Sequence, residues 1–263
     1  NRYIQVGSAP HLWSAHTDTV HRQGGRQNVW IEHDKSGDRH IMLPPGTKSN
    51  CLGADNTAGV WMLLEMIEAR VPGTYIFHRG EEKGGIGSAH IRTNFKSWLE
   101  SFDTAIAFDR RGYSSIITHQ MGMCGSDTFA TTLAAQIGMN HEPDEGGIFT
   151  DTANYTDHIA ECSNISAGFH DEHSARESLN IDYLYDLREA MLQLDMSKVK
   201  VTRQPGEDDF WWGFPTEVGG VSELRGDLYD LVRDHPMTVA DILEQLGVDE
   251  HELLERIYGV GTP

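Results

Sequence analysis

The sequence has few cysteines and no arrangement of them that would serve as a structural framework. Its 263 residues include three cysteines, Cys51, Cys124 and Cys162, with no C-x-x-C spacing. This number and spacing exclude a disulfide framework and a thiolate zinc site, and they favour a reducing compartment. We therefore expect a cytoplasmic protein. The chain begins with Asn1 rather than Met, which leaves open a missing native start or a removed leader.

Basic residues and long apolar runs are also scarce. The 21 Lys and Arg residues face 40 Asp and Glu residues, and the net charge is −19. Nucleic acids and anionic membranes require a basic face that neutralises phosphates, so we expect neither as a partner. No apolar run approaches the roughly 20 residues that span a bilayer. The acidity is most simply explained by solubility.

Short apolar runs alternate with helical patterns, which predicts an α/β fold: a three-layer α/β/α sandwich with a mixed, mostly parallel central sheet. Charged clusters follow several predicted strands, at the edge where open α/β sheets bind ligands. The predicted strands cover residues 11–20, 73–82, 104–112 and 164–170, with a hairpin over 29–43 that turns at 36–38. The predicted helices cover residues 56–71, 124–138 and about 180–196.

The composition changes after Val201, and this predicts three parts of the chain. Residues 1–203 form the main domain, 204–220 a linker or strap, and 221–263 an acidic helical appendage. A helix-turn-helix DNA-binding role for the appendage is disfavoured because it carries three arginines against ten acidic residues. We favour a packing or docking role, including a possible homo-oligomer through these helices.

Several motifs carry groups that bind metals. In "AHTDTV", His16 and Asp18 project from the same face of a strand, which suits a ligating imidazole and the carboxylate that orients it. In "LGADNTAGV", Asp55 immediately precedes a helix. Its two oxygens could each hold a different cation, but Asp55 or Asn56 could equally be a helix N-cap.

The stretch "HRGEEKGG" places Glu81 beside Glu82 among glycines. On a strand the two would point in opposite directions unless the chain turns. We interpret Glu81 as a general base that takes a proton from water and Glu82 as a metal ligand. Glu82 forms a candidate ligand set with His16, Asp55, Asp109 and His173. This set contains two His, two Asp and one Glu, which suits zinc. Two metals that share a carboxylate would need about five protein ligands.

Five motifs, in order, resemble those of the co-catalytic zinc exopeptidases, a clan of aminopeptidases and related carboxypeptidases. They are "SAHTDTV", "GADNTAGV", "GEEKGGIGS", "FDRRG" and "NISAGFHDEHSARESLN". The similarity extends from about His11 to Leu187. The stretch from Asp109 to His173 is too short for the dimerising lid domain that some members insert there, so the compact, lidless branch is favoured.

The resemblance implies two zinc ions per chain, one on His16, Asp55 and Asp109 and the other on Asp55, Glu82 and His173. It implies Glu81 as the general base, Asp18 as the residue that steadies His16, and a cis peptide bond between Asp55 and Asn56. It also makes Thr150, Asp151 and Tyr155 candidates for the substrate pocket. Arg110, beside a ligand, could bind a substrate carboxylate.

These roles predict a zinc-dependent metallopeptidase that cleaves a peptide or amide bond of a peptide or aminoacyl substrate. By resemblance, Asp rather than Glu at position 109 favours an aminopeptidase. A carboxypeptidase or an N-acyl-amino-acid deacylase of the same clan stays open. A glutaminyl-cyclase-like transferase would use a single zinc, and an inactive binding homologue would have lost Glu81 or part of the ligand set.

Overall fold

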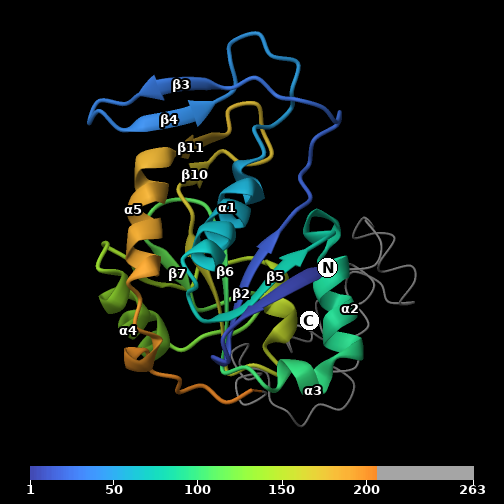
Figure 1. Cartoon of the computed structure of the whole chain (residues 1–263). Coiled ribbons are helices and arrows are strands. Elements are labelled where there is room, and N and C mark those ends of the chain that lie inside the picture. Colours follow the sequence, from blue (N-terminus) through green and yellow to red (C-terminus); the bar gives the residue numbers. More distant parts are fainter. Residues whose placement is uncertain (206–263) are drawn as a thin grey trace, which may run out of the picture. The chain divides into compact units, whose positions relative to one another are not determined.

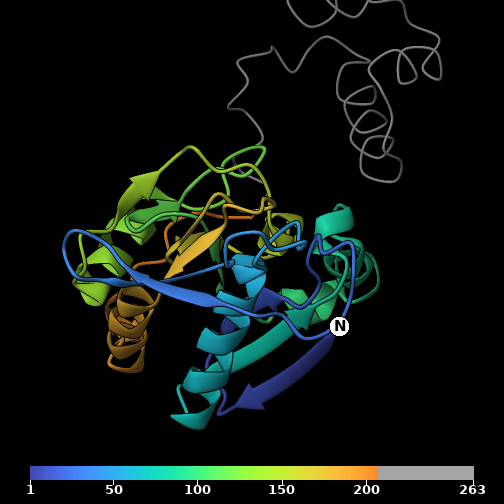
Figure 2. The ribbon, with the colours of Figure 1, turned by 90° about the horizontal axis from the view of Figure 1, so that it is seen from above.

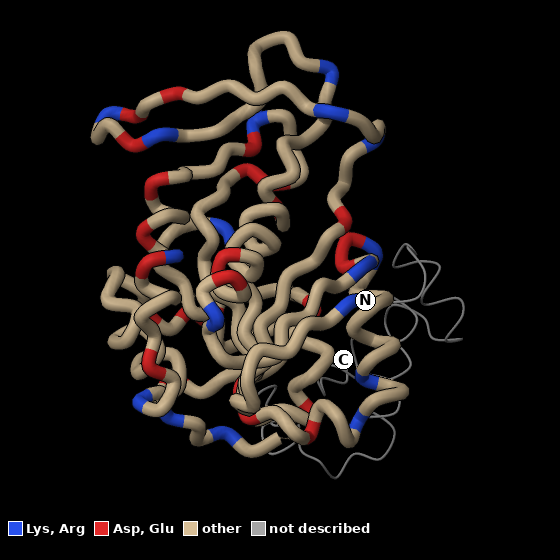
Figure 3. The backbone as a smooth tube through the Cα atoms, in the orientation of Figure 1, with Lys and Arg blue, Asp and Glu red and all other residues tan. Residues whose placement is uncertain are grey.

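A computed structural model describes residues 1–205, and Figure 1 shows how their helices and strands are arranged. The predicted appendage, 221–263, lies outside the described residues. So does the predicted linker, except for Gln204 and Pro205. Self-association through the appendage therefore stays a prediction. In the described part of the chain, acidic and basic residues are interspersed along the backbone (Figure 3).

The centre of the fold is a seven-stranded sheet in the order β1-β5-β2-β6-β9-β7-β8. Strands β5, β2, β6 and β9 run parallel to their neighbours in this series, while β1 pairs antiparallel with β5 and β7 antiparallel with β9. The bounds are β1 Arg2–Val6, β2 His11–His16, β5 Gly73–His78, β6 Thr104–Arg110, β7 Ser115–Ile117, β8 Glu142–Asp144 and β9 Glu161–Ser166.

A second, four-stranded sheet has the order β10-β11-β4-β3, and all its pairs are antiparallel. It combines the predicted hairpin with a later segment of the chain, and Figures 1 and 2 show the β3–β4 hairpin lying across one end of the fold. The bounds are β3 Trp30–His33, β4 Arg39–Met42, β10 Phe169–His170 and β11 Ser178–Asn180.

Helices pack on both faces of the central sheet, because successive strand residues point to opposite faces. On β2, Trp13 packs with α1, α4 and α5, whereas Leu12 packs in a separate cluster with residues of α2 and α3. The helices are α1 Ala54–Glu68, α2 Ile86–Asn94, α3 Lys96–Leu99, α4 Asp127–Ile137 and α5 Ile181–Leu192, with 3-10 turns η1 Glu81–Lys83, η2 Asp151–Tyr155 and η3 Met196–Lys198.

The predicted fold class, a layered α/β protein with a mixed, mostly parallel sheet, is confirmed. The hairpin turns where the sequence predicts, and Ser126 caps α4 through the backbone N–H of Phe129. The strands and α-helices that sequence patterns missed are β1, β7, β8, β11, α2 and α3. The strands β7 and β8 have three residues each, which is too short for a periodic pattern to stand out. Among the described residues, no helix is both long and apolar enough to cross a membrane.

A buried carboxylate fixes the last described segment to the sheet. Glu161, at the start of β9, is fully buried and accepts hydrogen bonds from the backbone N–H groups of Ser126, Thr202 and Arg203 at 2.7–3.0 Å. The Ser126 hydroxyl donates a further bond at 2.8 Å. The Arg203 guanidinium in turn donates to backbone carbonyls of residues 156, 159 and 160.

We expect Glu161→Ala to lower the free energy of unfolding by about 3 kcal/mol, because it leaves several buried donors without an acceptor. Urea denaturation measures this value. Glu142→Ala, at an exposed side chain, is the control and should change it by less than about 0.5 kcal/mol. Equal, small effects of both substitutions would contradict this role for Glu161.

Candidate metal centre

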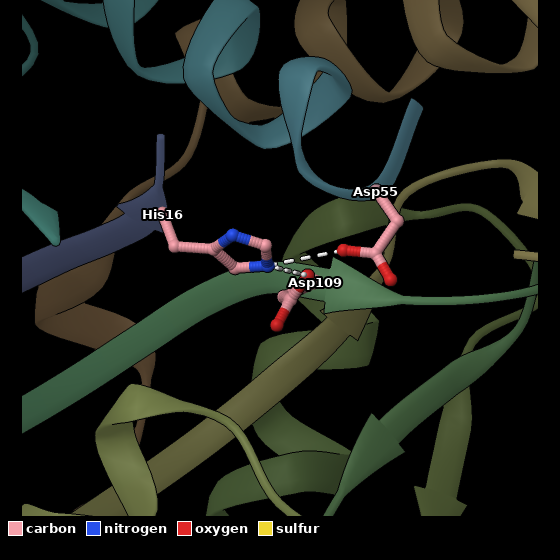
Figure 4. A group of neighbouring side chains, drawn as sticks. All are labelled: His16, Asp55 and Asp109. Atoms are coloured by element: carbon pink, nitrogen blue, oxygen red, sulfur yellow. Dashed lines mark hydrogen bonds and ion pairs between the residues drawn. The ribbon is translucent and has the colours of Figure 1, made fainter. Parts of the chain in front are cut away.

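Five side chains that are far apart in the sequence lie together at one end of the central sheet. In the described residues, two groups of potential ligands have their ligand atoms within 4.8 Å of one another. One contains His16, Asp55 and Asp109, which Figure 4 shows converging from three elements. The other contains Asp55, Glu82 and His173. Asp55 belongs to both groups.

The topology explains this convergence. His16 is the last residue of β2, Asp109 lies near the end of β6, and Glu82 follows β5. Because β5, β2 and β6 are parallel neighbours, their carboxyl ends meet at the same edge of the sheet. Asp55 begins α1 at this edge, and His173 lies in the loop between β10 and β11.

The Asp55 carboxylate presents one oxygen to each group. Its Oδ1 lies 3.0 Å from His16 Nε2, and its Oδ2 lies 3.1 Å from His173 Nε2. His16 Nε2 is also 3.3 Å from Asp109 Oδ1, and His173 Nε2 is 3.0 Å from Glu82 Oε2. Neither Asp55 nor Asn56 is the N-cap of α1, since Gly53 holds that position. The peptide bond from Asp55 to the next residue is cis, as the resemblance implies.

Asp18 acts on the site differently from the sequence prediction. His16 Nδ1 donates to the backbone oxygen of Asp18 at 2.9 Å, whereas the Asp18 carboxylate is 3.8 Å away. The carboxylate instead accepts backbone N–H groups of Gly80, Glu81 and Glu82 at 2.7–3.3 Å. The strand ends at His16, so the same-face geometry expected of a continuous strand does not apply. Asp18 therefore fixes both the His16 ring and the turn that carries the two glutamates.

Glu81 and Glu82 both face the site because the chain leaves the strand before them. The turn η1 is flanked by Gly80 and Gly84, with φ of 85° and 81°, a conformation that glycine adopts without strain. Glu81 Oε2 consequently lies 3.8 Å from His16 Nε2, while Glu82 approaches His173. The strand rule alone would have separated the two carboxylates.

Three polar side chains hold Asp109. The Thr150 hydroxyl donates to Asp109 Oδ2 at 2.6 Å, and the Asn56 amide donates to Oδ1. The Asn164 side-chain oxygen accepts the backbone N–H of Asp109 at 2.8 Å. Sequence analysis missed Asn56 and Asn164. The only signal for Asn164 was a polar residue within a predicted buried strand.

The residues predicted for the substrate pocket are buried or paired. Thr150, Asp151 and Tyr155 are at most 2% exposed, so none presents its side chain to a substrate at the surface. Thr150 binds Asp109 instead, and the turn η2 packs Tyr155 into the core. Arg110 is the last residue of β6, and its guanidinium lies 3.4 Å from the Asp144 carboxylate.

Burial and the crowding of carboxylates shift the pKa values of the cluster. Burial, and then the charge of Asp109, raises the pKa of Glu81 to about 10. Burial and the charge of Asp55 raise the pKa of Glu82 to about 7. Burial lowers the pKa of His16, but the charge of Asp109, the contacts with Asp109 and Asp55 and the charge of Glu81 together outweigh it, so this pKa lies far above its ordinary value. Positive charge, from protons or from cations, therefore stabilises the cluster.

The donor set fits divalent cations. His16 donates through Nδ1, so its Nε2 is the atom left for a metal, and two carboxylate oxygens lie within 3.3 Å of it. The buried Oε1 of Glu82 has no hydrogen-bond partner. Imidazole nitrogens together with carboxylate oxygens are ligands that zinc accepts.

Comparisons with known proteins show the same fold. No protein-family model and no curated protein sequence matches the chain. Among solved structures, it is similar to the aminopeptidase PepT of Bacillus cereus, with a TM-score of 0.54, 14% identity, and coverage of 73% of this chain and 82% of that one. It is also similar to a Staphylococcus aureus tripeptidase, with a TM-score of 0.51, 15% identity, and coverage of 73% of this chain and 82% of that one. An aminopeptidase of Desulfurococcus kamchatkensis gives a TM-score of 0.51 and 15% identity, with coverage of 76% of this chain and 82% of that one. At these identities the likeness shows a shared fold.

A second polar cluster lies buried next to the site. His78, the last residue of β5, is fully buried, and its Nε2 lies 3.3 Å from the Tyr155 hydroxyl. Its Nδ1 lies 3.9 Å from Asp151. Burial, and then the positive charge of His16, lowers the pKa of His78 to about 3. Between that value and the ordinary pKa of about 6.5, the unfolded chain binds a proton at this position and the folded chain does not.

We therefore expect His78 to make the folded protein less stable as the pH falls from 6.5 toward 3. The variant His78→Gln keeps a hydrogen-bond acceptor for Tyr155 but has no group that titrates. Its free energy of unfolding should therefore depend less steeply on pH than that of wild type, by about 1.4 kcal/mol per pH unit. Urea denaturation of both proteins between pH 6.5 and 4.5 measures the two slopes. Parallel slopes would contradict a neutral, buried His78.

Proposed function

We propose that the protein is a di-zinc hydrolase of peptide or amide bonds, and specifically an aminopeptidase that releases N-terminal residues. The observation that carries this proposal is the placement of Asp55, whose two carboxylate oxygens each face a different group of ligands. A carboxylate shared between two N/O ligand sets suits a pair of metal ions held close together, as in two-metal hydrolytic sites. The similarity in fold to two aminopeptidases and a tripeptidase supports the proposal.

One zinc would be held by His16, Asp55 and Asp109, and the other by Asp55, Glu82 and His173. When bound, the ions would supply Lewis acidity toward the oxygen of a scissile carbonyl. Together with Glu81, these residues bring four carboxylates into the site, and two divalent cations would balance their charge. His173 has a half-exposed side chain, which places the second group nearer to solvent.

Glu81 is the residue that we assign to proton transfer. Its carboxylate lies beside His16 but belongs to neither group of ligands, so it is available to a water molecule. Glu81 takes a proton from the water that attacks the carbonyl carbon. It delivers this proton to the leaving amine as the C–N bond breaks, which balances the hydrolysis. The backbone N–H of Glu81, bound to Asp18, keeps the side chain at the site.

Contacts in the structure bear on the alternative reactions. A carboxypeptidase or deacylase would need a cation for the substrate carboxylate, but Arg110 and Arg111 already approach Asp144 and Glu172 within 3.4 and 3.3 Å. We therefore do not include binding of a substrate carboxylate by Arg110 in the proposed function. Two groups of ligands disfavour a single-zinc cyclase, and the presence of Glu81 disfavours an inactive homologue.

The proposed activity predicts metal-dependent release of amino acids from aminoacyl anilides or short peptides. Glu81→Gln should lower kcat by at least about 100-fold because the amide cannot accept the proton, while bound zinc stays unchanged. A screen that also includes N-acyl-amino acids and C-terminally blocked peptides would measure both the activity and its direction. If the zinc-loaded wild type hydrolysed none of these substrates, the proposal would fail.

The shared position of Asp55 predicts different metal contents for two substitutions. Asp55→Ala should lower bound zinc from two ions to nearly none, because both groups lose a ligand. His173→Ala should lower it to about one ion, because only the second group loses a ligand. Elemental analysis after dialysis measures these ratios. Asp157→Ala, at a surface residue paired with Arg92, is the control and should keep the wild-type content. Equal losses from Asp55→Ala and His173→Ala would contradict the shared role.

A further inference from the structure

Glu177 is a buried carboxylate next to the centre that belongs to neither group of ligands. Its side chain is fully buried and accepts three backbone hydrogen bonds. Oε2 accepts the N–H groups of Leu52 and Gly53, both at 2.8 Å, and Oε1 accepts the N–H of Asp55 at 3.0 Å. Both oxygens are thus used by the segment that leads into Asp55.

These bonds fix the backbone from which the shared carboxylate projects. Residues 52–55 precede the first regular turn of α1, where backbone N–H groups have no partner within the helix. The N-cap residue is Gly53, which has no side chain that could accept them. Glu177 supplies the missing acceptor from 122–125 residues away in the sequence. Its contact with the N–H of Asp55 acts directly on the residue that both groups share.

Glu177 also belongs to the loop that carries His173. Its own N–H donates to the carbonyl of Ser174 at 3.1 Å. The next residue, Ser178, begins β11 and pairs with Met42 of β4, which fixes the other end of the loop. Glu177 therefore connects the loop that carries His173 to the start of α1, which carries Asp55. Across this connection, His173 Nε2 and Asp55 Oδ2 lie 3.1 Å apart.

We propose that Glu177 is a positioning residue that sets the metal affinity of the site by holding Asp55 in register with His173. This inference rests on the proposed zinc function. Glutamine cannot replace Glu177, since one of its two terminal atoms is an N–H donor, whereas both glutamate oxygens accept N–H groups here. Loss of such a supporting contact weakens metal binding by about 10- to 100-fold in metal sites generally.

The test measures zinc affinity by competition with a chromophoric chelator in wild type, Glu177→Gln and Glu177→Ala, each shown by circular dichroism to be folded. We expect affinity to fall by about 10- to 100-fold in both variants. The matched control is Glu161→Gln, because Glu161 is another fully buried carboxylate that accepts backbone N–H groups, but outside both groups of ligands. It should lose stability and keep the wild-type zinc affinity.

Rescue separates positioning from general loss of structure. Glu177→Ala removes a CH₂–COO⁻ group, which acetate can replace against the three free N–H groups. Added acetate should therefore restore zinc affinity in Glu177→Ala, relative to its effect on wild type, and leave that of Glu161→Gln unchanged. If wild type bound no zinc, the proposed function would fail. If wild type bound zinc and the Glu177 variants bound it as tightly, only the role of Glu177 would be overturned. If Glu177→Ala bound zinc more weakly than wild type and acetate did not restore its affinity, this result would also count against the positioning role of Glu177.

Discussion

The structure depends on holding four carboxylates close together at one end of a sheet. Asp55, Glu81, Glu82 and Asp109 would repel one another and the low-dielectric surroundings would strengthen the repulsion. The arrangement is stable only if positive charge enters it and if the backbone resists the tendency of the acids to separate. The first requirement is met by protons or by bound cations. The second explains the number of buried polar contacts around it.

Those supporting contacts share a pattern, in which backbone groups do much of the positioning. The Asp18 carbonyl orients His16, and the Asp18 carboxylate binds the N–H groups of the glutamate turn. Glu177 does the same for the segment that leads into Asp55. Asp109 is an exception, because Thr150 and Asn56 donate to its carboxylate oxygens. Asp55, Glu81 and Glu82 are anchored through their backbone N–H groups, so these bonds do not use their side-chain oxygens. Those oxygens stay available for metal ions.

The second sheet gives these anchors their geometry. The β3–β4 hairpin pairs with β11, and β11 directly follows the loop that contains His173 and Glu177 (Figure 1). Four candidate ligands come from the ends of β2 and β6, the turn after β5 and the start of α1, while His173 comes from the loop that this second sheet closes. The site therefore joins two sheets, and its exposed side is the side of His173.

The sequence by itself determined the layered α/β class, since alternating strand and helix patterns reflect burial that each local segment must satisfy. It also singled out His16, Asp55, Glu82, Asp109 and His173 as candidate ligands, because their motifs resemble, in order, those of a zinc exopeptidase clan, and the structure brings these residues together. Only the tertiary structure decided which oxygen of Asp55 faces which histidine, that Asp18 acts through its carbonyl, and that Tyr155 is buried. These features arise from contacts between segments distant in the chain, and no local periodicity encodes them.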